Sequence, residues 1–356
     1  MLPTDLYTQH RLNEPKPGHY LLTPSERERR RAVLSHAPEL APLPPIEQHN
    51  PFILVPLFHQ RLATLLSYAP FITGFVLEIE QLAQRITHLM AHTPDASCAA
   101  LLLTPAPHYT AAHSVQVAAI LALARPQLAN SHSHFTTLIS AALTMNVGAV
   151  ALQDDLSHQN APPSSLQHNG LKLHPFLSSA LLREAGIDDP VWHRLVLEHH
   201  EQANGKGYPL GLSATQQHPL SAILRVGDSL CASLSPRVAR SRNTHDSLHT
   251  LLTRSATADR PLVECFIQAL GFYPPGRFVK LANGVTAIVV RRGLVMDLPC
   301  IAIPNAQGNF QEQDADTPAL RIVDSSTVTL NARQVTQLAQ LWEEKPAKTS
   351  AKNSQT

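Results

Sequence analysis

Hydrophobic residues recur with a helical period along the middle of the chain. Five of them before residue 92 are spaced three or four positions apart: Phe75, Ile79, Leu82, Ile86 and Leu89. This spacing places them on one face of a helix that packs against a core. Residues 111–124 are apolar on nearly every side, which predicts a central buried helix with His113 near its start. Similar patterns at 138–150, 191–201 and 220–234 predict a mainly α domain.

The pattern changes after Gly271, where short β-branched runs replace the helical period. Two such runs flank Asn283-Gly284, a dipeptide that favours a tight hairpin turn. Residues 298–303 and 319–323 are candidates for further strands, and 331–343 for a short amphipathic helix. The sequence therefore predicts a small β-rich extension after the helical domain.

The first 50 residues are rich in proline and charge. The charged run at 26–31 is predicted to form a solvated helix face, with contact to an anionic partner as the alternative. The proline-rich stretch at 37–51 predicts an extended, weakly packed arm. The predicted organisation has four parts: an N-terminal arm with lead-in helices (1–95), a helical domain (96–271), a β-rich extension (272–343) and a disordered tail (344–356).

Charge and cysteine content argue against several classes of protein. Lys and Arg number 28 against 27 Asp and Glu, a net charge of +1, which gives no electrostatic reason to expect nucleic acid or an anionic membrane as a partner. The four cysteines are far apart with no CxxC pair, which argues against a zinc ribbon or a disulfide framework. The first ten residues do not read as a signal peptide, and no membrane-spanning segment is predicted. A cytoplasmic protein is expected.

Five side chains that can ligate a metal lie on or beside the predicted helices: His113, His174, His199, His200 and Asp228. Facing helices build metal sites in bundle interiors, and imidazole and carboxylate both bind divalent cations. Each residue also has a structural explanation. The two adjacent histidines suit a solvated helix end, and His174 suits a helix start because Pro175 follows it. Asp228 is close enough in sequence to Arg225 for an ordinary ion pair.

A glycine-rich loop follows the paired histidines. Gly205, Gly207 and Gly211 surround Tyr208-Pro209 within a short run. Glycine permits positive backbone angles and close approach, whereas proline fixes its own backbone angle. The composition indicates a shaped loop held beside the histidines, although a purely structural turn would use the same residues.

Five segments of the chain follow one another in order: HYTAAHSVQVA, AALTMNVGA, LHPFLSSALL, HHEQANGKGYPLGL and LSAILRVGD. This order resembles the HD-GYP domain, a group of HD phosphohydrolases linked to cyclic di-GMP hydrolysis in bacteria. The resemblance implies an HD-type helical bundle over residues 96–271, followed by the strand-rich extension often found in this group.

The resemblance also implies roles for individual residues. The three later histidines would bind one metal ion, and His113 and Asp228 would belong to the site of a second. Gly207, Tyr208 and Pro209 would shape a nucleotide site and contact GGDEF-domain partners. The basic residues expected to contact nucleotide phosphate are Arg237 and Arg240.

The sequence departs from the family at the residues that give the family its name. Met145, Asn146 and Ala149 stand where relatives have the histidine, aspartate and lysine of the HD motif. Other family positions are also changed: Tyr109, Gln202, Asn204 and Cys231. Neutral asparagine and soft methionine are poor ligands for a hard bridged metal pair. The expectation is therefore one divalent transition metal (zinc, manganese or iron) or none, with the histidines otherwise hydrogen-bonded as core residues.

Three functions follow from this pattern. The leading hypothesis is a degenerate HD-GYP protein in cyclic di-GMP signalling, without phosphodiesterase activity, that acts as a nucleotide sensor or protein-interaction module. The second is a residual metal-dependent phosphodiesterase with an unusual metal set. The third is a scaffold that binds no nucleotide.

Overall fold

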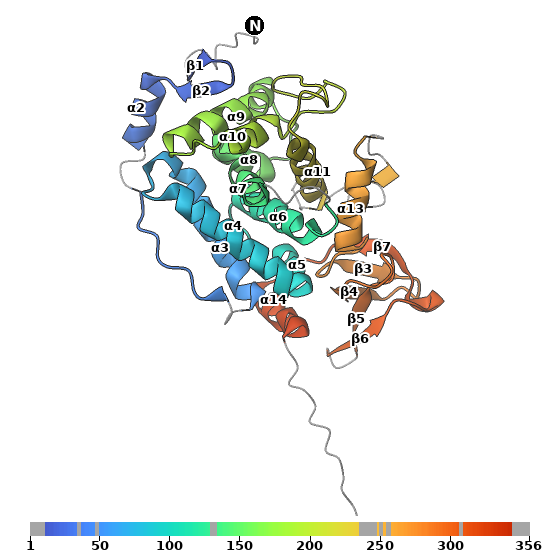
Figure 1. Cartoon of the computed structure of the whole chain (residues 1–356). Helices are drawn as coiled ribbons and strands as arrows, with labels where there is room; N and C mark the ends of the chain where they lie inside the picture. Colours follow the sequence, from blue (N-terminus) through green and yellow to red (C-terminus); the bar gives the residue numbers. More distant parts are fainter. Residues whose placement is uncertain are drawn as a thin grey trace, which may run out of the picture.

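The computed structural model shows a helical body with a small sheet at one end (Figure 1). It describes residues 11–33, 37–46, 50–128, 134–234, 248, 252–253, 258–305 and 309–343. Arg237, Arg240 and the tail at 344–356 lie outside the described residues. The prediction of a mainly α protein with a β extension is confirmed.

Ten helices form the body within the described residues: α3 (Pro51–Ser67), α4 (Phe75–His92), α5 (Pro94–Leu103), α6 (Tyr109–Ala124), α7 (Phe135–Thr144), α8 (Val150–His158), α9 (Ser165–Glu184), α10 (Pro190–Glu198), α11 (Pro219–Leu234) and α13 (Arg260–Leu270). Helix α6 is at the centre, and α3, α4, α7, α11 and α13 pack around it (Figure 1). Its residues are buried on nearly every side, as its apolar sequence predicts.

The lead-in helices share the hydrophobic core of the rest of the body. Leu54 and Phe58 on α3 and Ile79 on α4 belong to the same cluster of buried side chains as Leu121 on α6. Burial of these apolar side chains on helices far apart in sequence stabilises one continuous core.

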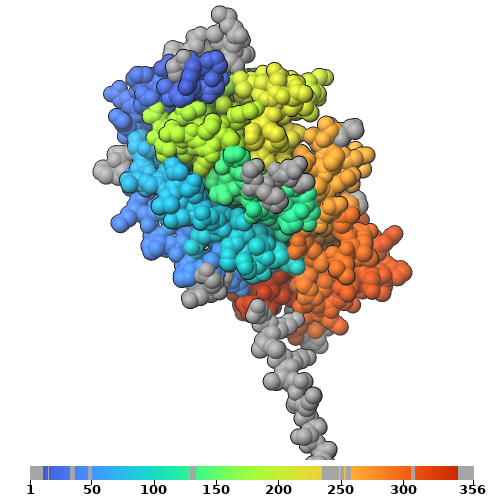
Figure 2. Space-filling view, viewed as in Figure 1, coloured from blue at the N-terminus to red at the C-terminus, as the bar shows by residue number. Residues whose placement is uncertain are grey.

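The N-terminal segment begins with a hairpin, β1 (Leu12–Lys16) and β2 (His19–Leu22), followed by α2 (Pro24–Val33). The hairpin lies against α9 (Figure 2), where the Tyr20 ring is 4.5 Å from that of Phe176. The charged run forms α2, but its face is not wholly solvated. Glu26 is buried and accepts hydrogen bonds from Arg29 and Arg30.

The proline-rich stretch lacks regular secondary structure over residues 37–45. None of residues 37–46 is fully buried and five of the ten are exposed, so the segment packs only in part. Leu40 and Leu43 pack against the core, and the carbonyl oxygens of Ala41 and Pro44 accept hydrogen bonds from arginines on α3 and α4.

The segment between α7 and α9 differs from its prediction. The expected single helix over 138–150 ends at Thr144, and a 3-10 turn (Val147–Ala149) leads into α8. Most of the expected loop at 154–170 is helical in α8 and α9. Phe135–His158 is long and apolar enough to cross a membrane by length and composition, which the sequence prediction overlooked. About 67% of its apolar window is buried inside the protein, as in a core helix.

The C-terminal sheet has the order β6-β5-β4-β3-β7, with every neighbouring pair antiparallel. Its strands are β3 (Phe278–Leu281), β4 (Thr286–Arg291), β5 (Cys300–Pro304), β6 (Phe310–Asp314) and β7 (Ile322–Ser326). The predicted hairpin joins β3 and β4, and Gly284 has a φ of 83° in its turn. Helix α14 (Ala332–Ala339) packs Leu338 against one face of the sheet.

Candidate metal centre

His174 lies in the middle of α9, so the predicted position at a helix start is wrong. The helix begins at Ser165, where Ser164 provides a capping box. Pro175 has no backbone N–H, so the carbonyl of Leu171 four residues before it is left without its usual helical partner. The Nδ1–H of His174 donates to that carbonyl oxygen at 2.6 Å. The proline therefore frees the acceptor that fixes the orientation of the His174 ring.

His199 follows the last residue of α10, Glu198. The last carbonyls of a helix have no intrahelical partner, and the Nδ1–H of His199 donates to one of them, on Val196, at 2.7 Å. A carbonyl oxygen can only accept a hydrogen bond, so Nδ1 carries the proton in His174 and His199 alike. The Nε2 atom of each neutral ring is therefore left with a lone pair.

The Nε2 atoms of His174 and His199 are 3.1 Å apart, a distance at which two lone pairs repel unless a cation or proton lies between them. The ring of His200 lies beside both, and one ligand nitrogen from each of the three residues lies within 4.8 Å of the others. Burial, together with neighbouring His199, lowers the pKa of His174 to about 3, which disfavours a proton as the bridge. The three residues fit one transition-metal ion with an open coordination position.

His113 and Asp228 form a buried pair next to this group. The Nε2–H of His113, on α6, donates to Oδ1 of Asp228, on α11, at 2.7 Å. Burial would raise the pKa of Asp228, but the hydrogen bond and the nearby histidines lower it below its ordinary value. Arg225 pairs with Asp259 instead, so the alternative explanation of Asp228 as the ion-pair partner of Arg225 is wrong.

The glycine-rich loop is built on Glu201, which sequence reasoning did not single out as a site residue. Its buried carboxylate accepts hydrogen bonds from the backbone N–H groups of Leu210 (2.6 Å), Gly211 (3.0 Å) and Leu212 (2.9 Å). A Cβ on Gly207 would lie 2.3 Å from the backbone nitrogen of Gln202, so only glycine permits this close approach. The available signal in the sequence was an acidic residue, Glu201, placed just before a glycine-rich turn.

Tyr208 places its ring over the centre. It stacks on His200 with ring centroids 4.6 Å apart, and burial raises the pKa of its hydroxyl. Glu201 thus holds the backbone of the loop in shape, and Tyr208 brings the loop into contact with His200.

A family model of the HD domain matches residues 97–261. The chain is similar to this family over the helical region that carries the candidate metal centre. The cyclic di-GMP phosphodiesterase PA4108 of Pseudomonas aeruginosa is 24% identical over 212 residues, which are 59% of this chain and 51% of that protein. The chain therefore matches about half the length of this curated relative.

A solved structure shows the same fold as this chain. It is Bd1817, described as an HDG"Y"P protein from Bdellovibrio bacteriovorus, with a TM-score of 0.50 and 14% identity over 69% of this chain and 80% of that one. The HD-GYP resemblance found in the sequence motifs is confirmed.

The three positions that the sequence resemblance assigns to the HD motif, Met145, Asn146 and Ala149, hold no charged side chain. Met145 is fully buried in the hydrophobic core. Asn146 is also buried, and its side-chain oxygen accepts a hydrogen bond from the amide of Gln153 at 2.8 Å. Ala149 ends the 3-10 turn and is buried.

The backbone of the HD-motif segment is nevertheless held close to α9. The N–H of Gly148 donates to Oγ of Ser178 at 2.9 Å, and a Cβ at Gly148 would lie 2.8 Å from the carbonyl oxygen of His174. The segment thus packs against the helix that carries His174, and its side chains offer no anionic ligand.

The other four positions that differ from the family pattern also carry side chains other than Asp, Glu, Lys or Arg: Tyr109, Gln202, Asn204 and Cys231. Tyr109 stacks on His113 with ring centroids 5.6 Å apart. Cys231 is fully buried, which raises the pKa of its thiol. Asn204 and Gln202 are exposed in the loop, where the side-chain oxygen of Asn204 accepts from the N–H of Lys206.

Proposed function

We propose that this chain is a degenerate HD-GYP protein that holds one transition-metal ion, such as zinc, manganese or iron, at His174, His199 and His200. It works in cytoplasmic cyclic di-GMP signalling as a nucleotide sensor or protein-interaction module, without phosphodiesterase activity. The observation that carries the proposal is the buried, neutral Asn146, engaged with Gln153 at the position of the bridging aspartate.

Charge balance supports a single ion. Two divalent cations within about 4 Å of each other need anionic ligands to offset their repulsion. Among the described residues, Asp228 is the carboxylate whose charge acts on all three histidines. One carboxylate, which also accepts a hydrogen bond from His113, supplies a single negative charge, too little to offset the repulsion between two divalent cations.

A binding role is supported by the loop that keeps its shape beside the weakened centre. Glu201 and Gly207 fix the backbone, and the half-buried Tyr208 ring is available near His200 for stacking with a base. Cyclic di-GMP is the proposed ligand because the curated relative is named as a phosphodiesterase of that nucleotide. A GGDEF-domain protein is the partner class to test.

Metal content, hydrolysis and nucleotide binding should be measured on the same purified sample. The proposal expects at most one metal ion per chain, no hydrolysis of cyclic di-GMP, and saturable heat on titration with that nucleotide. His168→Ala is the matched control for His200→Ala, because His168 is an exposed histidine on α9.

The alternatives give different outcomes. Two metals with turnover that His200→Ala abolishes would establish a residual phosphodiesterase. Absence of heat with metal-loaded and with chelated protein would leave the nucleotide-independent scaffold.

A further inference from the structure

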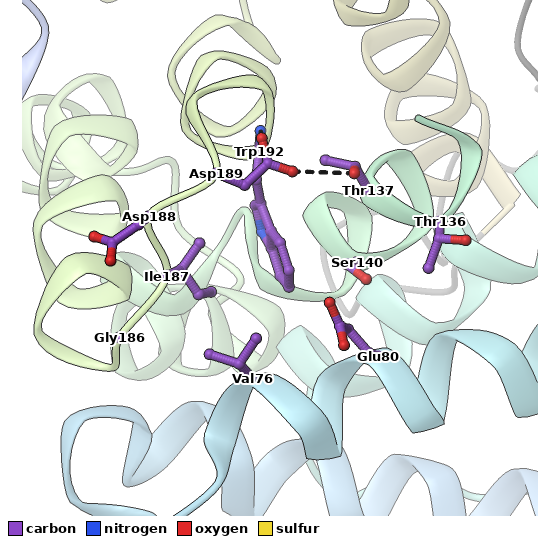
Figure 3. A pocket seen from close by; sticks show the side chains of 10 residues that line it. All are labelled: Val76, Glu80, Thr136, Thr137, Ser140, Gly186, Ile187, Asp188, Asp189 and Trp192. Atoms are coloured by element: carbon purple, nitrogen blue, oxygen red, sulfur yellow. Dashed lines mark hydrogen bonds between the residues drawn. The ribbon is translucent and has the colours of Figure 1, made fainter. Parts of the chain in front are cut away.

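A cavity of about 150 Å³ lies between α4, α7 and the connection from α9 to α10. Figure 3 shows side chains from all three elements facing it. None of the three clustered histidines lines it, so it is separate from the candidate metal centre. Its charged lining residues are all acidic: Glu80, Asp188 and Asp189.

One buried polar group that lines this cavity lacks a partner. Ser140 is fully buried on α7, and its hydroxyl has no hydrogen-bond partner among the described residues. Ser140 and Glu80 both line the cavity (Figure 3). Glu80 likewise has no ion pair or hydrogen bond within the described part of the chain. A buried hydroxyl without a partner is costly, and a ligand that donates a hydrogen bond would remove that cost.

The acid on the opposite wall is held in place by the backbone. One oxygen of Asp189 accepts from the N–H of Val191 at 2.8 Å, and the other accepts from the hydroxyl of Thr137 at 3.2 Å (Figure 3). Its negative charge is therefore fixed on the cavity wall, where it attracts a cation without needing to move.

The dimensions favour an organic cation over a metal ion. Among the described residues, the three histidines are the only group of three or more metal-ligating side chains whose ligand atoms lie within 4.8 Å of one another, so the three carboxylates here are too dispersed to share one ion. Between them the wall is apolar: the Trp192 indole extends toward Val76 and Glu80 (Figure 3). Aromatic faces attract organic cations, and aliphatic walls suit a carbon chain.

We propose that this cavity binds a small primary ammonium ion. The ammonium group donates to Glu80 and Ser140, and its short carbon chain packs against Trp192 and Val76. This inference does not depend on the metal, the nucleotide or the activity of the HD domain.

Tryptophan fluorescence offers a direct test. The chain has two tryptophans, Trp192 and Trp342, so Trp342→Phe leaves Trp192 as the only indole. In that background, n-propylammonium chloride should change the fluorescence saturably, with a dissociation constant on the order of 1 mM for so small a ligand. Neutral n-propanol and sodium chloride at matched ionic strength should produce no saturable change.

Variants locate the site. Glu80→Gln should weaken n-propylammonium binding about tenfold, the effect of removing one charge-assisted hydrogen bond. Ser140→Ala should weaken it about threefold and should fold, because it removes a hydroxyl that has no partner. Glu264→Gln, at an exposed acid on α13, is the matched control and should bind normally. Equal binding of n-propanol, unchanged affinity in both cavity variants, or no saturable signal would each overturn the proposal.

Discussion

The Nε2 atom of His174 lies 3.1 Å from the Nε2 atom of His199, and both rings donate Nδ1–H to a backbone carbonyl. The two nitrogens therefore face each other as acceptors, in the arrangement that a metal-ligating histidine pair adopts when carbonyls orient its rings. His174 and His199 therefore do not form a donor–acceptor hydrogen bond with each other, and both Nε2 lone pairs are oriented to bind a cation.

Zinc should stabilise the folded protein through these histidines. At a free zinc concentration 100 times the dissociation constant, the free energy of unfolding should rise by about 2.7 kcal/mol. Thermal unfolding with zinc and with a chelator measures the shift. His174→Ala should abolish it and His168→Ala should retain it; an equal shift in both variants would place zinc elsewhere.

Restoring the HD motif should add a second metal. In a Met145→His, Asn146→Asp double variant, Gln153 can still donate to the new carboxylate, and metal content should rise from one to two ions per chain. The control is Met145→Leu, which keeps the core apolar and should leave the metal content unchanged. If the double variant folds but still binds one ion, residues other than these two prevent the second site.

Pro175→Ala should lower metal affinity without lowering the stability of helix α9. The new N–H can bond to the Leu171 carbonyl, so α9 should become as stable or more stable, while His174 loses its acceptor. Loss of such an orienting partner lowers metal affinity by about 10- to 100-fold. Zinc titration followed by chemical unfolding measures both quantities. Pro56→Ala, at a proline inside α3, is the control and should leave zinc affinity unaltered.

The buried His59 should make stability depend on pH. Both of its ring nitrogens lack partners among the described residues, and burial lowers its pKa to about 4. The unfolded chain therefore takes up a proton near pH 6.5 that the folded chain resists. As pH falls from about 6.5 to about 4, this residue should lower the free energy of unfolding by about 1.4 kcal/mol per pH unit.

His59→Leu should remove that part of the pH dependence. Urea unfolding of the variant and the parent at pH 7.5 and pH 5 measures the difference, with His168→Leu as the exposed control. The same pH dependence in parent and His59→Leu would show that His59 is protonated freely in the folded state.

The sequence predicted the elements whose patterns are strong in themselves. Helix α6 is apolar on every side, and Asn283-Gly284 fixes the β3–β4 hairpin. Strand β6 escaped prediction because FQEQD is polar, and it forms a strand only through its pairing with β5. His174 was misplaced because a proline was taken as a helix start, when the capping signal lay at Ser164.

The candidate centre was only partly accessible from sequence. The set of histidines expected to meet came from the family resemblance, because spacing alone could not select among the 20 histidines of the chain. The proton positions on His174 and His199 depend on carbonyls that the folded helices expose. The role of Glu201 likewise depends on how the loop returns over its carboxylate.

The shared hydrophobic core sets a limit on how the helical domain can be excised. The family match begins at residue 97, yet Leu54, Phe58 and Ile79 pack into the same core as α6. A fragment starting at that boundary would expose the apolar flank of α6 to water and invite aggregation. In this chain, the unit of folding is larger than the unit of homology.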